Sequence, residues 1–325
     1  MARDLKAFLR HRLLPGGHRR TGILVKVLIY VILIALCFVY IYPILHMAVT
    51  SLKSLTDLLD PSVKWLPHEL TIANYTEALE VMGFKQHLAD TLLVTVIPAL
   101  CQTVACSLAG YAFARFRFKG RSILMLCVLL TFIVPFPVLV VPTYTMYSTY
   151  GILRTIWTMI LPAISGQGLR AAIFILIFRA TYEQIPFSLD EAARVDGAGE
   201  ARIFLTIGVP LGLPAMITSF LFSFVWYWNE TYTTSLYMGN ASLGSSKSIS
   251  TLVMELARFE DGYKAYLEKL GGWAATMSTG GGVNMQNEAV TMAGTILTIA
   301  PLLIVYFCLQ RYFTDAIDRS GITGE

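Results

Sequence analysis

Apolar residues in this chain gather in long runs, a pattern that predicts membrane-crossing helices. A membrane helix needs about 20 predominantly apolar residues to cross the hydrocarbon layer. Six segments meet this requirement, at residues 24–49, 88–114, 123–144, 156–179, 211–233 and 289–309. The first, second, third and sixth are each predicted as a single span. We therefore expect an all-α membrane protein with six transmembrane helices.

The fourth and fifth segments contain residues that disturb a regular helix. Pro162, Gly166 and Gly168 interrupt the fourth segment, which also carries Arg170. We therefore expect its outer half to be bent or partly unwound. The fifth segment opens beside Pro210, and a proline is tolerated better in the first turn of a helix than in its middle. This places the predicted start of the fifth helix near that proline.

The composition supports a membrane protein and offers no metal or disulfide framework. Of the 325 residues, 55% are hydrophobic and only 14% are charged, whereas a soluble domain usually carries about a quarter charged residues. The cysteines all fall inside apolar runs, without a CxxC pair or interleaved histidines, which argues against a disulfide framework and a zinc site. They are Cys37, Cys101, Cys106, Cys127 and Cys308.

The positions of lysine and arginine predict how the spans are oriented, because cytoplasmic loops are enriched in these residues. The N-terminal segment is basic, and the short connection after the second span carries Arg115, Arg117, Lys119 and Arg121. The connections after the first and third spans carry few basic residues. Both chain ends are therefore expected in the cytoplasm, on the inner side of the cell membrane.

This orientation divides the chain into a membrane domain with its loops and two cytoplasmic ends. The predicted parts are a cytoplasmic N-terminal segment at 1–23, a six-span transmembrane domain at 24–310 and a cytoplasmic tail at 311–325. Within the domain, residues 181–210 form a cytoplasmic loop and residues 239–288 an external loop. The stretch at 252–258 looks helical, so the external loop is either a flexible connector or an element that reaches a partner protein outside the membrane.

The cytoplasmic loop contains a short helix with well-defined ends. Pro186 cannot extend the preceding helix without a kink. Ser188 and Glu191 have the spacing of a capping box, in which each side chain satisfies a free backbone donor. Asp190 and Glu191 complement the positive end of the helix dipole. Gly197 permits the left-handed conformation that ends a helix.

The same helix is thin, because Ala192 and Ala193 allow another backbone to approach closely. These residues by themselves favour neither of two interpretations, a helix that docks on a partner or an ordinary surface connector. This loop resembles the signature of bacterial binding-protein-dependent ABC permeases. The matching residues are Glu191-Ala192-Ala193, Gly197 and Ile207-x-Val209-Pro210, all at the required spacings, with Val209 in place of the usual leucine.

The resemblance implies a type I ABC importer permease fold in which this loop forms the coupling helix, seated in a cleft of an ATP-hydrolysing subunit. It implies two ATPase subunits, a second, homologous permease subunit in a heterodimer and an extracytoplasmic solute-binding protein, besides membrane lipid and without nucleic acid. ATP and Mg are expected on the partner ATPase, with no cofactor on this chain. The implied ATPase-docking residues are Asp190, Glu191, Ala192, Ala193, Asp196 and Gly197.

Further motifs are similar to the carbohydrate-importing subset, specifically the maltose-permease second subunit type. They are Thr50-Ser51-Leu52-Lys53, Trp65-Leu66-Pro67, Asn74-Tyr75, residues 109–116, Trp228-Asn229-Glu230 and residues 310–313. Asp90-Thr91 departs from the usual Asn-Ser, and the tail lacks the usual lysine. The resemblance implies import of a sugar or oligosaccharide, with a polyol or a phosphorylated polyol as the alternative.

Polar residues within predicted spans are candidates for lining the substrate path, because a polar side chain in the membrane is costly and usually faces a cavity or a partner. Each has a simpler explanation: Arg170 as a packing or snorkelling residue, Asp90 as an interfacial one, and the aromatic residues of the fifth span as a membrane-interface belt. The candidates are Asp90, Arg170, Trp228, Asn229 and Glu230.

Other classes of membrane protein fit the sequence less well. An ion-driven secondary transporter needs buried carboxylates near mid-membrane, and the first, third and sixth spans have none. We find no nucleophile–base pair and no H-E-x-x-H helix, so no catalytic or metal residue is predicted. The glycines at 280–282 lack the G-x-x-x-x-G-K spacing of a phosphate loop, which places ATP hydrolysis on another chain.

Overall fold

The computed structural model describes residues 23–239, 249–269 and 288–321, and within these ranges every element of regular structure is helical apart from one isolated β-bridge. The all-α prediction is confirmed. The chain divides into two units, Met1–Glu77 with Gln286–Ile296, and Ala78–Met285 with Leu297–Glu325. The predicted N-terminal segment lies almost wholly outside the described residues, as do 240–248, 270–287 and 322–325 of the predicted external loop and tail.

Four helical stretches are long and apolar enough to cross a membrane. They are α2 (Ile23–Thr50), α5 (Phe84–Arg115), the run Glu200–Asn229 and Glu288–Tyr312 within α17 (Glu288–Gly321). Two further pairs of helices pass the same test when each bent pair is taken as one span, which gives up to six in the described part of the chain. Helix α17 continues past the predicted end of the last span at 309, so the predicted tail begins as helix.

The third predicted span, at 123–144, is a bent pair of helices rather than one continuous helix. Helix α6 (Arg121–Ile133) and helix α7 (Phe136–Thr149) form a pair bent by 102°. Pro135 causes the break, because the residue before a proline is pushed out of the helical region. Val134 accordingly has φ −66° and ψ 121°, and Pro135 has φ −65° and ψ 130°.

The fourth predicted span is interrupted where the sequence indicated. Helix α8 (Trp157–Ile164) ends before Gly166, and helix α9 (Ala171–Gln184) begins after Arg170. Both residues have positive φ, 70° for Gly166 and 53° for Arg170. A positive φ is uncommon for a residue with a side chain, so the surrounding contacts must hold Arg170 in place. The second bent pair joins α9 to α10 (Phe187–Val195) at 71°.

The fifth helix begins well before the predicted start at 211. It comprises α11 (Glu200–Ile203), a π-helical turn η1 (Phe204–Gly208) and α12 (Val209–Asn229), and α13 (Tyr232–Met238) follows it. The N–H of Val209 bonds the carbonyl of Phe204 across the wide turn. The π turn leads directly into the first turn of α12, where Pro210 is tolerated because it has no N–H to donate. The proline therefore marks a change of helix type rather than a helix start.

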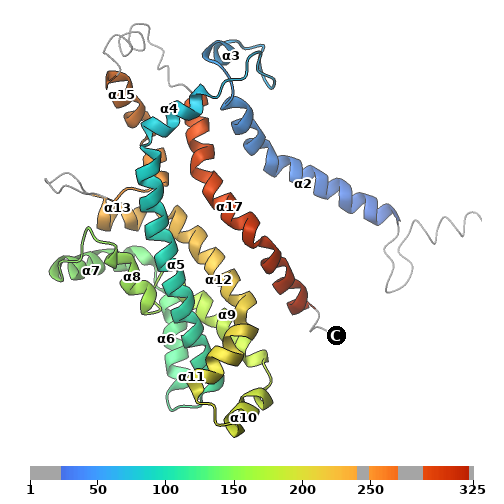
Figure 1. The fold of residues 1–325 in the computed structure, drawn as a ribbon, viewed down its shortest axis with the longest axis vertical. Helices are drawn as coiled ribbons and strands as arrows, with labels where there is room; N and C mark the ends of the chain where they lie inside the picture. Colours follow the sequence, from blue (N-terminus) through green and yellow to red (C-terminus); the bar gives the residue numbers. More distant parts are fainter. Residues whose placement is uncertain (1–22, 240–248, 270–287, 322–325) are drawn as a thin grey trace, which may run out of the picture. The chain divides into compact units, whose positions relative to one another are not determined.

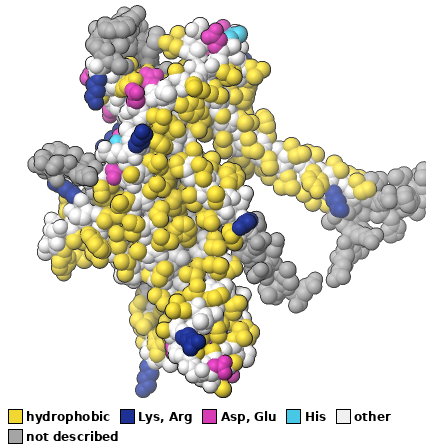
Figure 2. Space-filling view, in the orientation of Figure 1, with side chains coloured by type: hydrophobic (Ala, Val, Ile, Leu, Met, Phe, Trp, Pro, Cys, Tyr) yellow, Lys and Arg dark blue, Asp and Glu magenta, His cyan; other side chains and the backbone are white. Residues whose placement is uncertain are grey.

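Helix α5 is the central element of its unit and packs against α8, α9 and α12 (Figure 1). Small residues allow this close packing, as expected for helices in lipid. A Cβ on Gly110 of α5 would lie 2.4 Å from the Cβ of Phe178 on α9, and one on Gly212 of α12 would lie 2.8 Å from the ring of Tyr182. Where α5 and α12 face the viewer in Figure 2, the surface is mostly hydrophobic, as a membrane requires.

In the other unit, two of the recognised motifs, Thr50-Ser51-Leu52-Lys53 and Asn74-Tyr75, form one hydrogen-bonded structure after α2. The side-chain amide of Asn74 donates to the carbonyls of Ser51 (2.9 Å) and Lys53 (2.8 Å). The buried ammonium of Lys53 donates to the carbonyls of Val63 (2.8 Å) and Lys64 (3.1 Å). The loop that contains α3 (Leu55–Leu59) and leads to α4 (Ala73–Val81) is therefore tightly organised.

Asp57 on α3 completes this loop. Its carboxylate accepts hydrogen bonds from the backbone N–H of His68 (2.9 Å) and of Glu69 (3.3 Å), and lies 3.0 Å from Nδ1 of His68. Burial acts to raise the pKa of Asp57, but the hydrogen bonds from His68 and Glu69 outweigh it, so the pKa lies below its usual value. The carboxylate is thus charged while it holds the loop.

The described part of the predicted external loop is ordered on α5. Its helical middle is confirmed as α14 (Leu252–Ala257), which is followed by α15 (Phe259–Lys269). The N–H of Leu252 donates to the hydroxyl of Thr91 at 2.9 Å, and both residues are fully buried. Glu255 lies 3.9 Å from the ring of His87. This part of the loop is therefore attached to the start of α5 and is not a free connector.

Candidate functional site

Helix α10 lies at one end of its unit, between α9 and α11 (Figure 1). Helix α9 ends at Gln184, and its C-cap Ile185 is extended because Pro186 follows. Pro186 itself is the N-cap of α10. No side chain caps the helix, so the predicted capping box of Ser188 and Glu191 is wrong. The proline begins the helix two residues earlier than predicted, which leaves Ser188 inside the first turn.

A buried ion pair fixes α10 to the end of α5. Nε of Arg115 lies 3.4 Å from Oδ2 of Asp190, and both side chains are only 1% exposed. Nη2 of Arg115 also donates to the carbonyl of Ile185 at 2.8 Å. The guanidinium lies 4.5 Å from the ring centroid of Phe187, close enough for a cation–π contact.

These contacts set both the position and the rotation of α10. Arg115 binds the backbone just before the helix, the ring at its first residue and the carboxylate one turn later. The arrangement turns Asp190 inward, so its side chain is covered by this chain and is not available to a partner, contrary to its prediction as a docking residue. Of the other predicted docking residues, Ala193 is half-buried and the rest are exposed: Glu191, Ala192, Asp196 and Gly197.

The end of α10 has the predicted left-handed glycine. Gly197 has φ 79°, and the chain then turns into α11. The guanidinium of Arg194 bridges this turn with two contacts to Glu200, at 2.8 Å and 3.2 Å. The hydrogen bonds from Arg194 also hold the two ends of the turn together at the surface, where both side chains are well exposed.

A second polar cluster holds the interruption between α8 and α9. The side-chain amide of Gln102 donates to the carbonyl of Leu169 at 2.8 Å, and the hydroxyl of Tyr227 donates to the amide oxygen of Gln102 at 2.9 Å. The N–H of Leu169 contacts the Tyr227 hydroxyl at 3.4 Å. Non-helical backbone is tolerated at membrane depth only where protein or water satisfies it, and here α5 and α12 supply both partners.

Gly168 is required for that cluster. A Cβ at this position would lie 2.1 Å from Oε1 of Gln102 and 2.6 Å from the Tyr227 hydroxyl. Arg170, next but one along the chain, is exposed and its guanidinium lies 4.9 Å from the ring centroid of Trp226. The cluster therefore presents one cation, stacked on an aromatic ring, at the break.

The candidate path residues are placed differently from one another. Trp228 is 2% exposed and packs on Phe224, whereas Asn229 is exposed and donates to a carbonyl of its own helix. Glu230 accepts from the N–H of Thr233 at 2.8 Å at the start of α13. Within the described residues, no hydrogen bond or ion pair joins any two of the five candidates, so their role in a substrate path stays a prediction.

Sequence reasoning did not identify three residues that organise these clusters. Arg115 counted as a charge for orientation and as part of the motif at 109–116, Tyr227 only as part of an aromatic group, and Gln102 not at all. A buried glutamine in the middle of an apolar span is a signal that was available, since such residues usually bind a partner. No such signal links Arg115 to Asp190 across 75 residues of sequence.

Comparison with known proteins places the chain in a transport family. The family described as binding-protein-dependent transport system inner membrane component matches residues 105–319, which include the end of α5 and all of α9, α10 and α12. A protein of Synechocystis sp. named osmoprotective compounds uptake permease protein GgtD is 27% identical over 306 residues, covering 92% of this chain and 93% of that protein. The polygalacturonan/rhamnogalacturonan transport system permease protein YtcP of Bacillus subtilis is 26% identical, covering 93% and 99%.

A solved structure shows the same fold. It belongs to a bacterial ABC transporter involved in the import of the acidic polysaccharide alginate, and its chain aligns with a TM-score of 0.68 at 22% identity, covering 92% of this chain and 100% of the other. The type I importer permease fold predicted from the motifs is thereby confirmed. The chain belongs to the family of binding-protein-dependent transport system inner membrane components.

Proposed function

We propose that this chain forms the translocation path of an ABC importer together with a second, homologous permease subunit, and that α10 transmits the movements of an ATPase subunit to it. A solute-binding protein outside the membrane delivers the solute, and two ATPase subunits bind ATP and Mg. The family membership and the apolar helices support a multi-pass membrane permease. The path opens alternately to the outside and to the cytoplasm because the partners bind the two conformations of the membrane subunits with different affinities.

The observation that carries the docking proposal is the contrast between the two faces of α10. One face is fixed by Asp190 to Arg115, with both side chains almost fully covered. Apolar side chains on the same helix are uncovered, with Leu189 43% and Val195 87% exposed. A rigidly held helix with exposed apolar residues and an exposed Glu191 suits a protein partner. A helix that only connected two spans would need neither the anchor nor the apolar surface.

For the solute we propose a sugar or oligosaccharide. The support comes from the solutes for which relatives are named, among them a polygalacturonan/rhamnogalacturonan permease and an arabinooligosaccharide permease of Halalkalibacterium halodurans, 25% identical over 94% of this chain. The osmoprotective-compound permease favours a second candidate, a polyol or a similar small solute. Arg170, exposed on the ring of Trp226, offers a cation to either an acidic saccharide or a phosphorylated polyol.

Co-purification of the full-length chain in mild detergent tests the docking role. We expect an ATPase and a second permease to be retained by the wild type, and the ATPase to be lost from Val195→Asp and from Glu191→Ala. Leu66→Asp is a matched control, because Leu66 is similarly exposed, at 86%, but lies on the loop after α2. If Val195→Asp retains as much ATPase as Leu66→Asp, α10 is not the docking helix.

Uptake measurements distinguish the solutes and the energy source. Cells that express the transporter take up labelled oligosaccharide but not labelled polyol if the first proposal holds, and the reverse if the second holds. Uptake must stop when cellular ATP is depleted while the membrane potential is maintained. Uptake that follows the ion gradient instead would identify a secondary transporter and overturn the proposal.

A further inference from the structure

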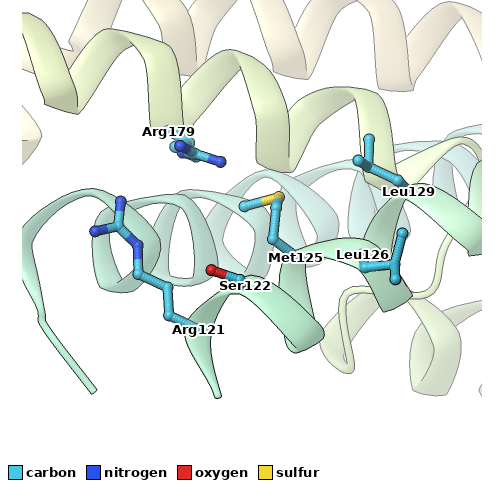
Figure 3. A pocket seen from close by; sticks show the side chains of 6 residues that line it. All are labelled: Arg121, Ser122, Met125, Leu126, Leu129 and Arg179. Carbon is cyan, nitrogen blue, oxygen red and sulfur yellow. The ribbon is translucent and has the colours of Figure 1, made fainter. Parts of the chain in front are cut away.

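A pocket of about 460 Å³ lies between the start of α6 and the second half of α9 (Figure 3). Its lining is chemically divided. The two arginines and the serine lie toward one end of the view and the leucines toward the other. The lining residues are Arg121, Ser122, Met125, Leu126, Leu129 and Arg179.

The polar end carries excess positive charge. Nη2 of Arg121 lies 3.2 Å from Oε1 of Glu183, and Nε of Arg179 lies 2.9 Å from the same oxygen. One carboxylate therefore balances two guanidinium groups. No hydrogen bond within the described residues involves Nε and Nη1 of Arg121 or the two Nη atoms of Arg179, and both side chains are about one-third exposed. These N–H groups and the hydroxyl of Ser122 point to an anion with several oxygens.

The apolar end is open to the surroundings of the helices. Leu126 is 55% and Leu129 39% exposed, whereas Met125 is 7% exposed and forms the covered floor. The arginines also lie at the predicted boundary of the bilayer, since Arg121 lies two residues before the third apolar run and Arg179 ends the fourth. The pocket thus passes from cationic to apolar in the direction in which a membrane passes from headgroups to acyl chains.

We propose that this pocket binds the phosphate of an anionic phospholipid, with an acyl chain along Leu126 and Leu129. Basic pockets between membrane helices bind anionic headgroups in this way. A soluble phosphate compound would use only the polar end and would leave exposed leucines beside it. The lipid would bridge α6 and α9, and α9 leads directly into α10, so the site lies next to the element proposed to dock the ATPase.

Native mass spectrometry of the full-length chain, with the subunits that co-purify, tests the site. The probes are phosphatidylglycerol and phosphatidylcholine with identical acyl chains, and inorganic phosphate as a competitor. We expect the wild type to retain phosphatidylglycerol preferentially. Each of Arg121→Gln and Arg179→Gln should reduce that retention about five-fold, because one basic residue near an anionic lipid contributes a factor of this size. Arg117→Gln is the control, since Arg117 is exposed on the same connection but does not line the pocket.

A variant with the opposite effect guards against loss of folding. Glu183→Gln removes the carboxylate that both arginines share, so retention of phosphatidylglycerol should rise, while phosphatidylcholine should be unchanged. Leu126→Ser should weaken retention of the lipid without making inorganic phosphate a better competitor. These changes do not involve α10 residues, so they are separable from a failure of the docking proposal.

Four results would overturn the lipid site. Equal retention of the two lipids by the wild type would show that the charge has no role. Equal loss in Arg117→Gln and Arg121→Gln would indicate general surface attraction. Displacement of the lipid by millimolar inorganic phosphate, or occupation of the pocket by a co-purified subunit that excludes lipid, would assign it to a soluble anion or to a protein interface.

Discussion

Two interruptions of the helical structure lie against α5, and they are held by different chemistry. Between α9 and α10, a charged pair, Arg115 with Asp190, is buried with 1% exposure on each side. Between α8 and α9, neutral groups of Gln102 and Tyr227 bind the backbone of Leu169. The charged pair joins α5 to α10 through one side chain on each helix. The neutral cluster uses side chains of α5 and α12 to supply hydrogen bonds to the non-helical backbone between α8 and α9.

The difference teaches what each site can do. A buried ion pair is a poor source of net stability, but removing one partner leaves an unpaired charge at high cost, so such a pair defines one arrangement sharply. Neutral hydrogen bonds carry a smaller penalty when broken. We infer that the end of the unit with α10 is held in one orientation, while the break at 166–170 can adjust at lower cost.

The largest expected effect is that of Arg115→Ala. It leaves Asp190 buried without its partner and frees the carbonyl of Ile185, which should destabilise the protein by about 3–5 kcal/mol. Thermal unfolding of the purified chain, followed by intrinsic fluorescence, measures the loss, and co-purification of the ATPase should fail in parallel. A loss as small as that of an exposed arginine such as Arg117→Ala would contradict the anchoring role.

Paired replacement separates the stability of the anchor from its geometry. Arg115→Met combined with Asp190→Leu removes both charges, and such a change is often neutral or stabilising. We expect the double variant to recover most of the thermal stability lost in Arg115→Ala but to bind the ATPase less tightly, because α10 is no longer fixed in rotation. Full recovery of ATPase binding would show that any apolar contact suffices.

The second expected effect is that of Gln102→Leu. The carbonyl of Leu169 and the hydroxyl of Tyr227 lose their partner, and each unsatisfied buried group costs about 1–3 kcal/mol. Tyr227→Phe should cost less, because the amide of Gln102 still binds Leu169. Thermal unfolding ranks the variants, and the reverse order for Gln102→Leu and Tyr227→Phe would show that Tyr227 is the main support of the break.

Substitution of Gly168 tests the same break from its backbone. In Gly168→Ala the new Cβ would lie 2.1 Å from Oε1 of Gln102, so one of them must move. Overpacking of this kind costs about 1–3 kcal/mol. The new Cβ would also lie 2.6 Å from the Tyr227 hydroxyl, so restoring the space requires Gly168→Ala to be combined with both Gln102→Ala and Tyr227→Phe. This triple variant should then be no less stable than the double variant Gln102→Ala/Tyr227→Phe. Additive losses would mean that the clash is elsewhere.

Much of the fold was predictable from local signals. The long apolar runs identify the spans because crossing the hydrocarbon has one length requirement, and the glycines and proline at 162–168 predict an interruption that the structure has. Pro135 also indicated a possible break in the third span. The apolar run continues through this proline, however, and hydropathy cannot distinguish a straight span from a bent pair of helices. The π-helical turn before Pro210 is equally invisible to hydropathy.

The site was predictable only in part. The motif identified α10 and Gly197, and the family match supports the assignment. The capping box failed because a proline can begin a helix without a side-chain cap, so that Ser188 is not needed. The partner of Asp190 was beyond prediction, since contacts between residues far apart in sequence depend on how α5 and α10 pack. Burial, which decides between anchor and docking residue, is a property of that packing.

The smallest expected effect belongs to the second ion pair of α10 and sharpens the comparison with the first. Arg194 and Glu200 combine the same chemical groups as Arg115 and Asp190, with two short contacts, but their side chains are 40% and 44% exposed. Exposed pairs contribute little because water solvates each partner when the other is removed. Arg194→Ala should therefore leave the thermal unfolding temperature almost unchanged, and 1 M salt should have no further effect. A fall as large as that of Arg115→Ala would mean that the turn between α10 and α11, rather than the buried anchor, sets the orientation of the helix.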